Sequence, residues 1–278
     1  MRFSTTATPN ALIVARLTAA VLLLDAAPSP SPTPSDPCGS ISSLVDRPTV
    51  TTSPCTVRPG NVLLEDGWTN TITTGPGGGA TTSYPQSFLR AGTANPHLEI
   101  TFGLPSFDRS SVGGTPTAGW SDSSFGAKYE LGYSSKAVWG VDAIVSLPTG
   151  ARAFTAGNAQ YSGDFNWTYT LDSTWSLAGT LGANELSSLS SGGVARSYFA
   201  WIPSIVLSAS LPRSSSLFVE YAYYSQTATG ASERSLIDGG FARDIGPNVQ
   251  VDVEYGDLPT PVNAQTQHYV GAGAAIAF

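Results

Sequence analysis

The sequence predicts an all-β protein, a transmembrane antiparallel β-barrel of about twelve strands. Three observations favour it: period-two alternation in runs of about ten residues, connections that are alternately short and long, and few charged residues. Charged residues make up 12% of the 278 residues, about half the share usual in a soluble domain. So few charges suit a surface that faces lipid, and the expected location is the bacterial outer membrane.

An export signal is predicted over residues 1–27. Arg2 and Arg16 precede the apolar run LTAAVLLL at 17–24, and small residues and prolines follow it. This run is much shorter than the ~20 apolar residues of a membrane-spanning helix, and no later run is long enough. We therefore expect the chain to cross the membrane with strands alone.

Residues 28–59 form a Pro/Ser-rich stretch that we expect to be a separate periplasmic segment. It contains both cysteines of the chain, Cys38 and Cys55. In an exported protein an even cysteine count in a loop-rich region favours one disulfide. Closing a loop of this length would contribute about 3 kcal/mol in the chain-entropy model. No CxxC or His-Cys cluster accompanies the cysteines, so neither a metal site nor a cofactor is expected.

The barrel itself is expected over residues 60–278. In residues 137–147, for example, Trp139, Val141 and Val145 face one way, and Asp142 and Ser146 face the other. Twelve such runs are expected, at 61–69, 82–92, 97–104, 123–133, 137–147, 159–171, 174–184, 196–211, 216–226, 235–243, 248–256 and 267–278.

The connections between these runs alternate in length. Those after even-numbered runs are short, such as SSK at 134–136, and those after odd-numbered runs are longer and rich in Gly, Ser, Thr and Pro. This predicts short periplasmic turns and longer extracellular loops. The soluble alternative, a β-sandwich or β-helix, would put its charged residues on the outer face. Here the aromatic residues lie on the apolar face, which favours lipid outside and a polar lumen inside.

Aromatic residues cluster beside the proposed short turns. We expect an interfacial girdle there, formed by Tyr133, Trp139, Tyr169, Trp175 and Phe278.

The last stretch, HYVGAGAAIAF at 268–278, alternates between larger apolar and small residues. We expect it to be the final strand, which pairs with the first strand near 61–69 to close the sheet. Its glycines would face inward and keep the lumen clear. Phe278, as a terminal aromatic, resembles the signal read by the outer-membrane assembly machinery, so that machinery is an expected partner alongside outer-membrane lipid.

Charged side chains of inward parity are the candidates for a lumen lining. Two interpretations stay open for each: it lines a permeation path, or it forms a salt bridge across strands that fills the lumen. Acid exceeds base among them, so an open pore would prefer cations or neutral solutes to anions. They are Glu65, Arg90, Glu99, Lys128, Glu130, Asp142, Asp164, Glu220, Asp238, Asp252 and Glu254.

Several stretches carry a resemblance to a known family. They are LLEDGW (63–68), FLRAGTANPHLEITFGLP (88–105), FGAKYELGY (125–133), VSLPTG (145–150), SLFVEY (216–221), PNVQVDVEYG (247–256) and the C-terminal stretch. In their order and spacing the chain resembles the family of outer-membrane transporters labelled with the MetA pathway of phenol degradation. The resemblance implies a twelve-stranded barrel that passes small, often apolar or aromatic, molecules. The chain departs from the family pattern in two places. One is the segment before residue 60. The other is Asp66, whose outward parity predicts a bulge or a wrong register in the first strand.

The expected function is an outer-membrane channel for small solutes with a narrow, acidic lumen. The main alternative is a structural or adhesive barrel without transport. An outer-membrane lipase or protease is less favoured, because such sites need a histidine base beside a nucleophile and only His97 and His268 exist. No catalytic residue is therefore assigned. The net charge of −7 and the absence of a basic stripe exclude a nucleic-acid partner.

Overall fold

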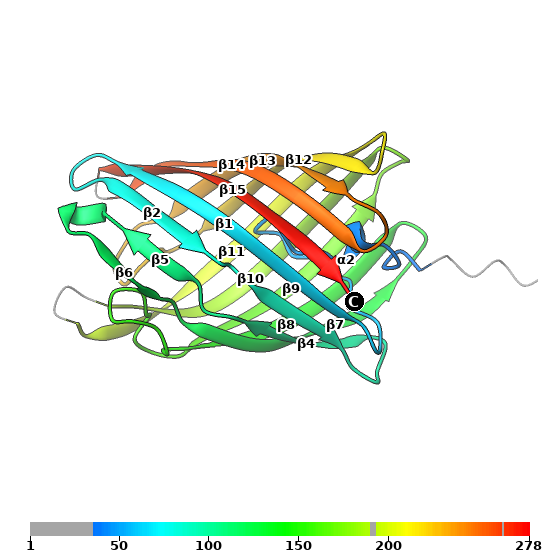
Figure 1. Ribbon diagram of the computed structural model, residues 1–278, viewed down its shortest axis with the longest axis horizontal. Helices are drawn as coiled ribbons and strands as arrows, with labels where there is room; N and C mark the ends of the chain where they lie inside the picture. The colour runs from blue at the N-terminus through cyan, green and yellow to red at the C-terminus, as the bar shows by residue number, and fades with distance from the viewer. Residues whose placement is uncertain (1–35, 190–192, 263) are drawn as a thin grey trace, which may run out of the picture. The chain divides into compact units, whose positions relative to one another are not determined.

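The protein is a closed antiparallel β-barrel, as seen in a computed structural model (Figure 1). The structure describes residues 36–189, 193–262 and 264–278, so the predicted signal peptide lies outside the described residues. All β segments belong to one sheet, and its ends meet because β15 (Gln265–Ala277) pairs with β1 (Val62–Thr74). No helix in these ranges is long and apolar enough to cross a membrane.

The barrel has twelve strands, three of which are broken into two segments. Prolines interrupt two of them, because Pro85 and Pro105 have no backbone N–H to donate. Backbone hydrogen bonds carry the ladder through the breaks: Gln86 N donates to Gly67 O at 2.9 Å, and Leu104 N to Ser87 O at 2.9 Å. The broken strands are β2 (Gly79–Tyr84) with β3 (Phe88–Gly92), β4 (Leu98–Gly103) with β5 (Phe107–Ser110), and β6 (Thr117–Trp120) with β7 (Ser123–Tyr133).

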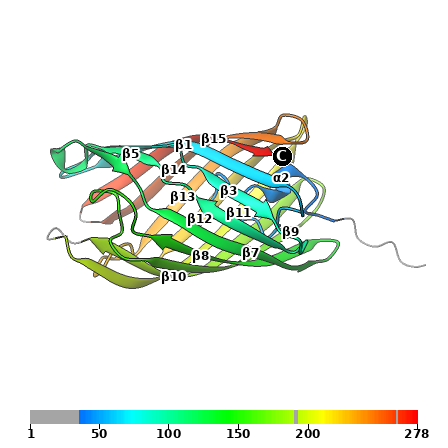
Figure 2. The same ribbon diagram turned by 60° about the horizontal axis from the view of Figure 1, so that its bottom comes forward.

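The other strands form the rest of the wall, and Figure 2 shows them from a second side. They are β8 (Ala137–Leu147), β9 (Gln160–Thr170), β10 (Trp175–Leu189), β11 (Ala195–Leu211), β12 (Ser215–Tyr224), β13 (Arg234–Asp244) and β14 (Val249–Val262).

Several strands run further than predicted on the side of the long connections. The stretches 70–74 and 257–262, expected in loops, continue β1 and β14, and residues 105–122 contain β5, β6 and the 3-10 turn η1 (Val112–Gly114). The prediction ended strands where apolar alternation stopped. Backbone pairing needs no apolar face once a strand has left the lipid, so the ladder continues in Ser/Thr-rich sequence.

The wall beside β6 is completed by a loop rather than by a strand. Within the described residues β6 pairs only with β5. The connection after β8 crosses the gap: Ala151 N donates to Trp120 O at 2.8 Å, and Asp122 accepts from Gly150 N and Ala156 N, each at 2.8 Å. One carboxylate thus holds this loop against the wall.

The aromatic girdle is present except for one residue. Trp139, Tyr169, Trp175 and Phe278 are all exposed on the outside. The assignment of Tyr133 was wrong, because a β-bulge between Glu130 and Gly132 shifts the register of β7 against β8. A bulge adds one residue and reverses the parity after it, so Tyr133 packs inward against the buried cluster of Cys38, Cys55 and Val138.

Asp66 is accommodated without a bulge. The pairing of β1 with β15 is continuous from Leu63↔Ala277 to Thr74↔Thr266, so the expected irregularity was wrong. The carboxylate is instead satisfied by Ser87 in the break between β2 and β3, whose hydroxyl donates to Asp66 Oδ1 at 2.8 Å. The proline-induced break therefore supplies the partner that this outward acid needs.

The closing seam follows the prediction. β15 lies beside β1 (Figure 1), and Phe278 exchanges backbone hydrogen bonds with Val62 at 2.8 and 3.2 Å. No edge is left at the seam, as a sheet in lipid requires.

Candidate functional site

Residues 36–59, here called the inner segment, lie inside the barrel. Their backbone and side chains make hydrogen bonds or ion pairs with residues of β1, β3, β4, β7, β9, β10, β11, β12 and β14. Strands that follow one another around the whole barrel can share one partner only if that partner occupies the lumen. The described part of the predicted periplasmic segment therefore fills the lumen of the barrel.

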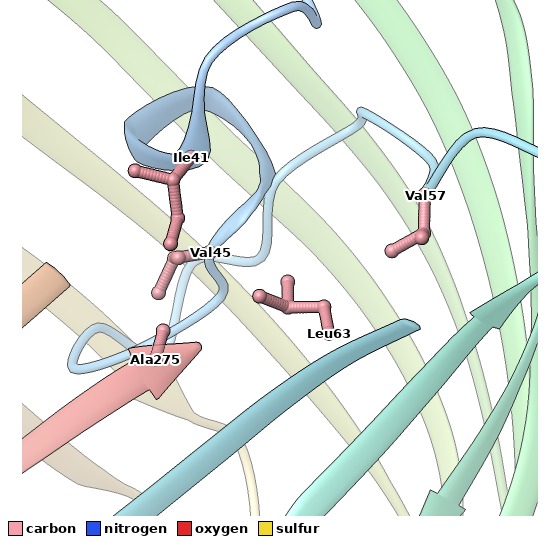
Figure 3. Close-up of a cluster of buried hydrophobic side chains, with 5 residues drawn as sticks. All are labelled: Ile41, Val45, Val57, Leu63 and Ala275. Atoms are coloured by element: carbon pink, nitrogen blue, oxygen red, sulfur yellow. The ribbon is translucent and has the colours of Figure 1, made fainter. Parts of the chain in front are cut away.

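The inner segment begins with a short capped helix, α2 (Ile41–Leu44). Ser40 caps it, and the side chains of Ser40 and Ser43 each accept from the other residue's backbone N–H. Ile41 and Val45 pack with Val57, Leu63 and Ala275, so the helix rests on the inner side of the β1–β15 seam (Figure 3). This apolar cluster anchors the start of the segment to the wall.

The predicted disulfide joins Cys38 to Cys55, with their Cα atoms 5.4 Å apart. Both cysteines are buried and pack against Val138 of β8. The bond closes a loop with a sequence separation of 17 residues, which contributes about 3 kcal/mol in the chain-entropy model. The inner segment is thus a closed loop held within the lumen.

Arg90 is the centre of the ion-pair network. Its Nε and Nη2 donate to the two oxygens of Glu99 at 2.8 and 3.1 Å, and its Nη1 donates to Glu65 Oε1 at 3.0 Å. It also donates to the carbonyl oxygens of Leu44 and Cys55 in the inner segment. The guanidinium therefore ties the segment to three strands, and none of its side chain is exposed.

Asp46 is the acidic counterpart in the inner segment. Lys128 Nζ donates to both of its oxygens at 2.7 and 2.8 Å, and Arg90 Nη1 lies 3.1 Å from Oδ2. Burial acts to raise the pKa of Asp46, but the charges of Arg90 and Lys128 more than offset it and hold the pKa below its ordinary value. Asp46 is accordingly ionised at neutral pH, and its Oδ1 accepts from Ser53 N at 2.8 Å.

Carboxylates on the wall bind backbone N–H groups of the inner segment. Glu65 accepts from Asp46 N and Arg47 N, at distances as short as 3.0 and 2.9 Å. Glu220, on a different side of the barrel, accepts from Val50 N at 2.7 Å and Thr51 N at 2.6 Å. Glu99 accepts from Val57 N at 2.7 Å. Hydrogen bonds to charged acceptors contribute about 1.5–3 kcal/mol each, so these contacts fix the path of the segment.

Two further ion pairs join the inner segment to the wall. Arg47 Nη2 lies 3.2 Å from Asp252 Oδ1, and Arg58 Nη1 lies 3.0 Å from Glu130 Oε2. Arg58 also binds Asp36 at 2.6 Å. Arginines of the segment thus neutralise acids that the strands alone would leave unpaired.

The predicted lumen residues all lie on the buried side of the wall. Nine of the eleven are buried, and Asp164 and Glu254 are half-buried. Those that contact the inner segment are Glu65, Arg90, Glu99, Lys128, Glu130, Glu220 and Asp252.

The remaining four predicted residues pair within the wall. Asp142 accepts from Asn166 Nδ2 at 2.6 Å and faces Asp164 across the β8–β9 pair. The hydroxyl of Tyr269 lies 2.9 Å from Asp238 Oδ2 and 3.2 Å from Glu254 Oε2. Asp142, Asp238 and Glu254 thus have neutral hydrogen-bond partners, whereas Asp164 lies opposite another acid.

The inward glycines of the last strand hold side chains instead of open space. A Cβ on Gly273 would lie 2.3 Å from Arg47 Nε, and one on Gly271 would lie 2.3 Å from Glu254 Oε1. The expectation that they keep the lumen clear was therefore wrong. The glycines create room, and charged groups occupy it.

A cavity of about 710 Å³ remains between the inner segment and the end of the barrel with the short turns. Its lining is rich in hydroxyl groups, including Ser53 and Thr51 of the segment and Ser176, Ser208 and Ser210 of the wall. Hydroxyl groups both donate and accept hydrogen bonds, so the cavity suits water and small polar solutes.

Sequence reasoning missed several residues of the site. Asp46, Arg47 and Arg58 lie in a Pro-rich segment that has no periodicity to indicate where a side chain points. Asn166 and Thr180 have inward parity, but only charged residues were selected; Asn166 accepts from the hydroxyls of Thr52 and Thr180, each at 2.7 Å.

Arg234 was also missed, because its strand was expected to begin at Ser235. It is buried at the start of β13 and donates from Nη1 to Gln267 Oε1 at 3.0 Å. Its Nε and Nη2 have no hydrogen-bond partner among the residues that the structure describes.

A twelve-stranded closed antiparallel barrel with an apolar outside and a charged, occupied lumen has the fold of an outer-membrane β-barrel. The chain belongs to the family described as "Putative MetA-pathway of phenol degradation", whose model matches residues 45–276. That match includes the second half of the inner segment. No curated protein matches the chain significantly.

Solved structures share this fold. A COG4313 outer membrane channel from Pseudomonas putida F1 is similar with a TM-score of 0.61 and 15% identity, over 80% of this chain and 97% of that one. The NanC porin is similar with a TM-score of 0.51 and 7% identity, over 76% of this chain and 98% of that one. At these identities the likeness shows the fold alone.

The two histidines were the candidates for a catalytic base. His97 Nδ1 lies 3.3 Å from Glu130 Oε1, and within the described ranges no hydrogen bond joins either histidine side chain to a serine. The described residues also contain no group of three or more His, Cys, Asp or Glu side chains that could hold a metal ion.

Proposed function

We propose that this protein is an outer-membrane channel for small solutes, aromatic ones included, and that the inner segment closes it in the state described here. The observation that carries the proposal is the ring of wall carboxylates and bases bound to residues 36–59. The structural likeness to the Pseudomonas putida outer membrane channel and the phenol-degradation description of the family support transport of small molecules.

The selectivity that we propose follows from the charges of the wall. Nine of the eleven predicted lumen residues are acids, and Arg47 and Arg58 of the inner segment neutralise two of them. When the segment moves, these acids face the open path, so the lumen favours cations and neutral solutes over anions.

The test is reconstitution of the refolded protein in planar bilayers. We expect a small single-channel conductance and, in a KCl gradient, a reversal potential that shows K⁺ passing in preference to Cl⁻. Liposome swelling in arabinose then measures passage of a neutral solute. A folded barrel that neither conducts nor admits arabinose, with or without its inner segment, contradicts transport and favours a structural role.

Phe278 carries a second part of the proposal, recognition by the assembly machinery. We expect Phe278→Asp to lower the amount of barrel in the outer membrane severalfold, because a charge replaces the exposed terminal aromatic at the closing seam. Phe278→Tyr, which keeps the ring, is the matched control. Quantitative immunoblots of outer-membrane fractions measure the effect. Equal levels of the Asp variant and the wild type contradict this role.

A further inference from the structure

The side chain of Arg47 rests on a prepared surface of the barrel wall. Asp252 of β14, Gly273 of β15 and Gly67 of β1 are partners in register, so the three residues form one row across three neighbouring strands. A Cβ on Gly67 would lie 2.1 Å from Arg47 Nη1, and a Cβ on Gly273 would lie 2.3 Å from its Nε. The two glycines therefore form a flat shelf, here called the glycine shelf, against which the guanidinium lies.

The carboxylate beside the shelf is only partly used. Asp252 is 3% exposed, and its Oδ1 accepts from Arg47 Nη2 at 3.2 Å. Its Oδ2 has no hydrogen-bond partner among the described residues, and neither has Arg47 Nε. A guanidinium and a carboxylate can form two parallel hydrogen bonds. Arg47 forms one, since its backbone is held in place by Glu65.

A free planar cation has no such tether. It can turn on the shelf until two N–H groups face Oδ1 and Oδ2, and thereby use the acceptor that Arg47 leaves unpaired. A buried carboxylate with an unused oxygen favours such a ligand strongly, because an unpaired buried acceptor costs free energy. The shelf admits a flat group, whereas any side chain larger than hydrogen at either glycine would fill it.

We propose that Asp252 and the glycine shelf form a binding site for solutes that carry a guanidinium or amidinium group, and that Arg47 occupies this site as an internal ligand. The proposal rests on the proposed function in one respect, that the inner segment leaves the lumen when the channel opens. In the wild type a solute of this class then competes with Arg47 for the wall.

Chemical rescue tests the site directly. In Arg47→Ala the shelf is empty while the inner segment is otherwise intact, and amide hydrogen exchange of residues 40–57 should accelerate about tenfold to a hundredfold, the factor that corresponds to a lost hydrogen bond to a charged group. Methylguanidinium should restore much of the protection. Urea, which is planar and uncharged, and tetramethylammonium, which is charged and not planar, should restore none.

Two wall variants in the Arg47→Ala background locate the effect. Asp252→Asn removes the charge of the acceptor, and Gly273→Val fills the shelf; each should abolish rescue by methylguanidinium. Asp257→Asn is the matched control, because Asp257 is on the same strand but exposed, and rescue should persist. Heat-modifiable gel migration confirms that each barrel is folded.

Rescue by urea or tetramethylammonium as strong as that by methylguanidinium would overturn the proposal, as would rescue that survives both Asp252→Asn and Gly273→Val. Hydrogen exchange does not depend on conduction. A barrel that stays silent in bilayers but shows the expected rescue would thus contradict the channel function and leave the binding site supported.

Discussion

Removal of residues 36–59 is expected to raise the single-channel conductance several-fold. The inner segment contacts strands all around the barrel, so its removal clears the lumen at the level of these contacts. The wall should survive, since Arg90 keeps Glu65 and Glu99 as partners without the segment. The measurement is the conductance of the refolded barrel in planar bilayers, compared with that of the full-length protein.

The matched control for this deletion is removal of residues 112–116. These residues lie in the connection between β5 and β6, where all but Val112 are exposed, and they make no contact with the inner segment among the hydrogen bonds of the described chain. Its conductance should equal that of the wild type. If the barrel that lacks residues 36–59 also had the conductance of the wild type, the inner segment would not close the path.

Replacement of Arg90 by Gln is expected to lower the free energy of unfolding by about 3–5 kcal/mol, the usual effect of removing one partner from a buried ion pair. The change leaves Glu65 and Glu99 facing each other with no base between them, and both are fully buried. It also frees the carbonyl oxygens of Leu44 and Cys55, so the inner segment should loosen as well. Urea unfolding of the barrel in detergent micelles measures the change.

Two further variants separate charge from general damage. Arg90→Gln combined with Glu99→Gln removes one of the stranded charges and should recover part of the lost stability. Arg109→Gln, an exposed position outside the network, should change the free energy of unfolding by less than about 0.5 kcal/mol. Stability of Arg90→Gln equal to that of Arg109→Gln would refute a central role for Arg90.

The outer wall was largely predictable because lipid imposes a simple rule on it. A strand between lipid and lumen must alternate apolar and polar residues with period two. The sheet must also close, because lipid cannot satisfy the backbone groups of an open edge. Trp139 and Val141 faced outward and Asp142 inward for this reason. The prediction failed where the backbone added a residue, since the bulge before Gly132 turned Tyr133 inward. A bulge leaves little trace in the pattern of apolar residues.

The inner segment was much less predictable. Its cysteines indicated a disulfide, since export and an even count suffice for that inference. Its position did not follow, because a Pro-rich stretch has no period from which a facing side can be inferred. Arg47 and Asp252 are 205 residues apart in the sequence. Nothing in the sequence around either residue predicts that the two side chains meet.

The sequence by itself determined a twelve-stranded barrel, its inside and outside, its closing seam and the surplus of inward acids. These features depend on the alternation of apolar and polar residues that lipid imposes on a strand. Each strand carries that alternation in its own sequence. Only the tertiary structure decided what those acids bind. The glycines of the last strand predicted open space, but the fold fills it with Glu254 at Gly271 and with Arg47 at Gly273. Arg47 lies there because the buried carboxylate of Asp252 requires a partner, which the inner segment supplies.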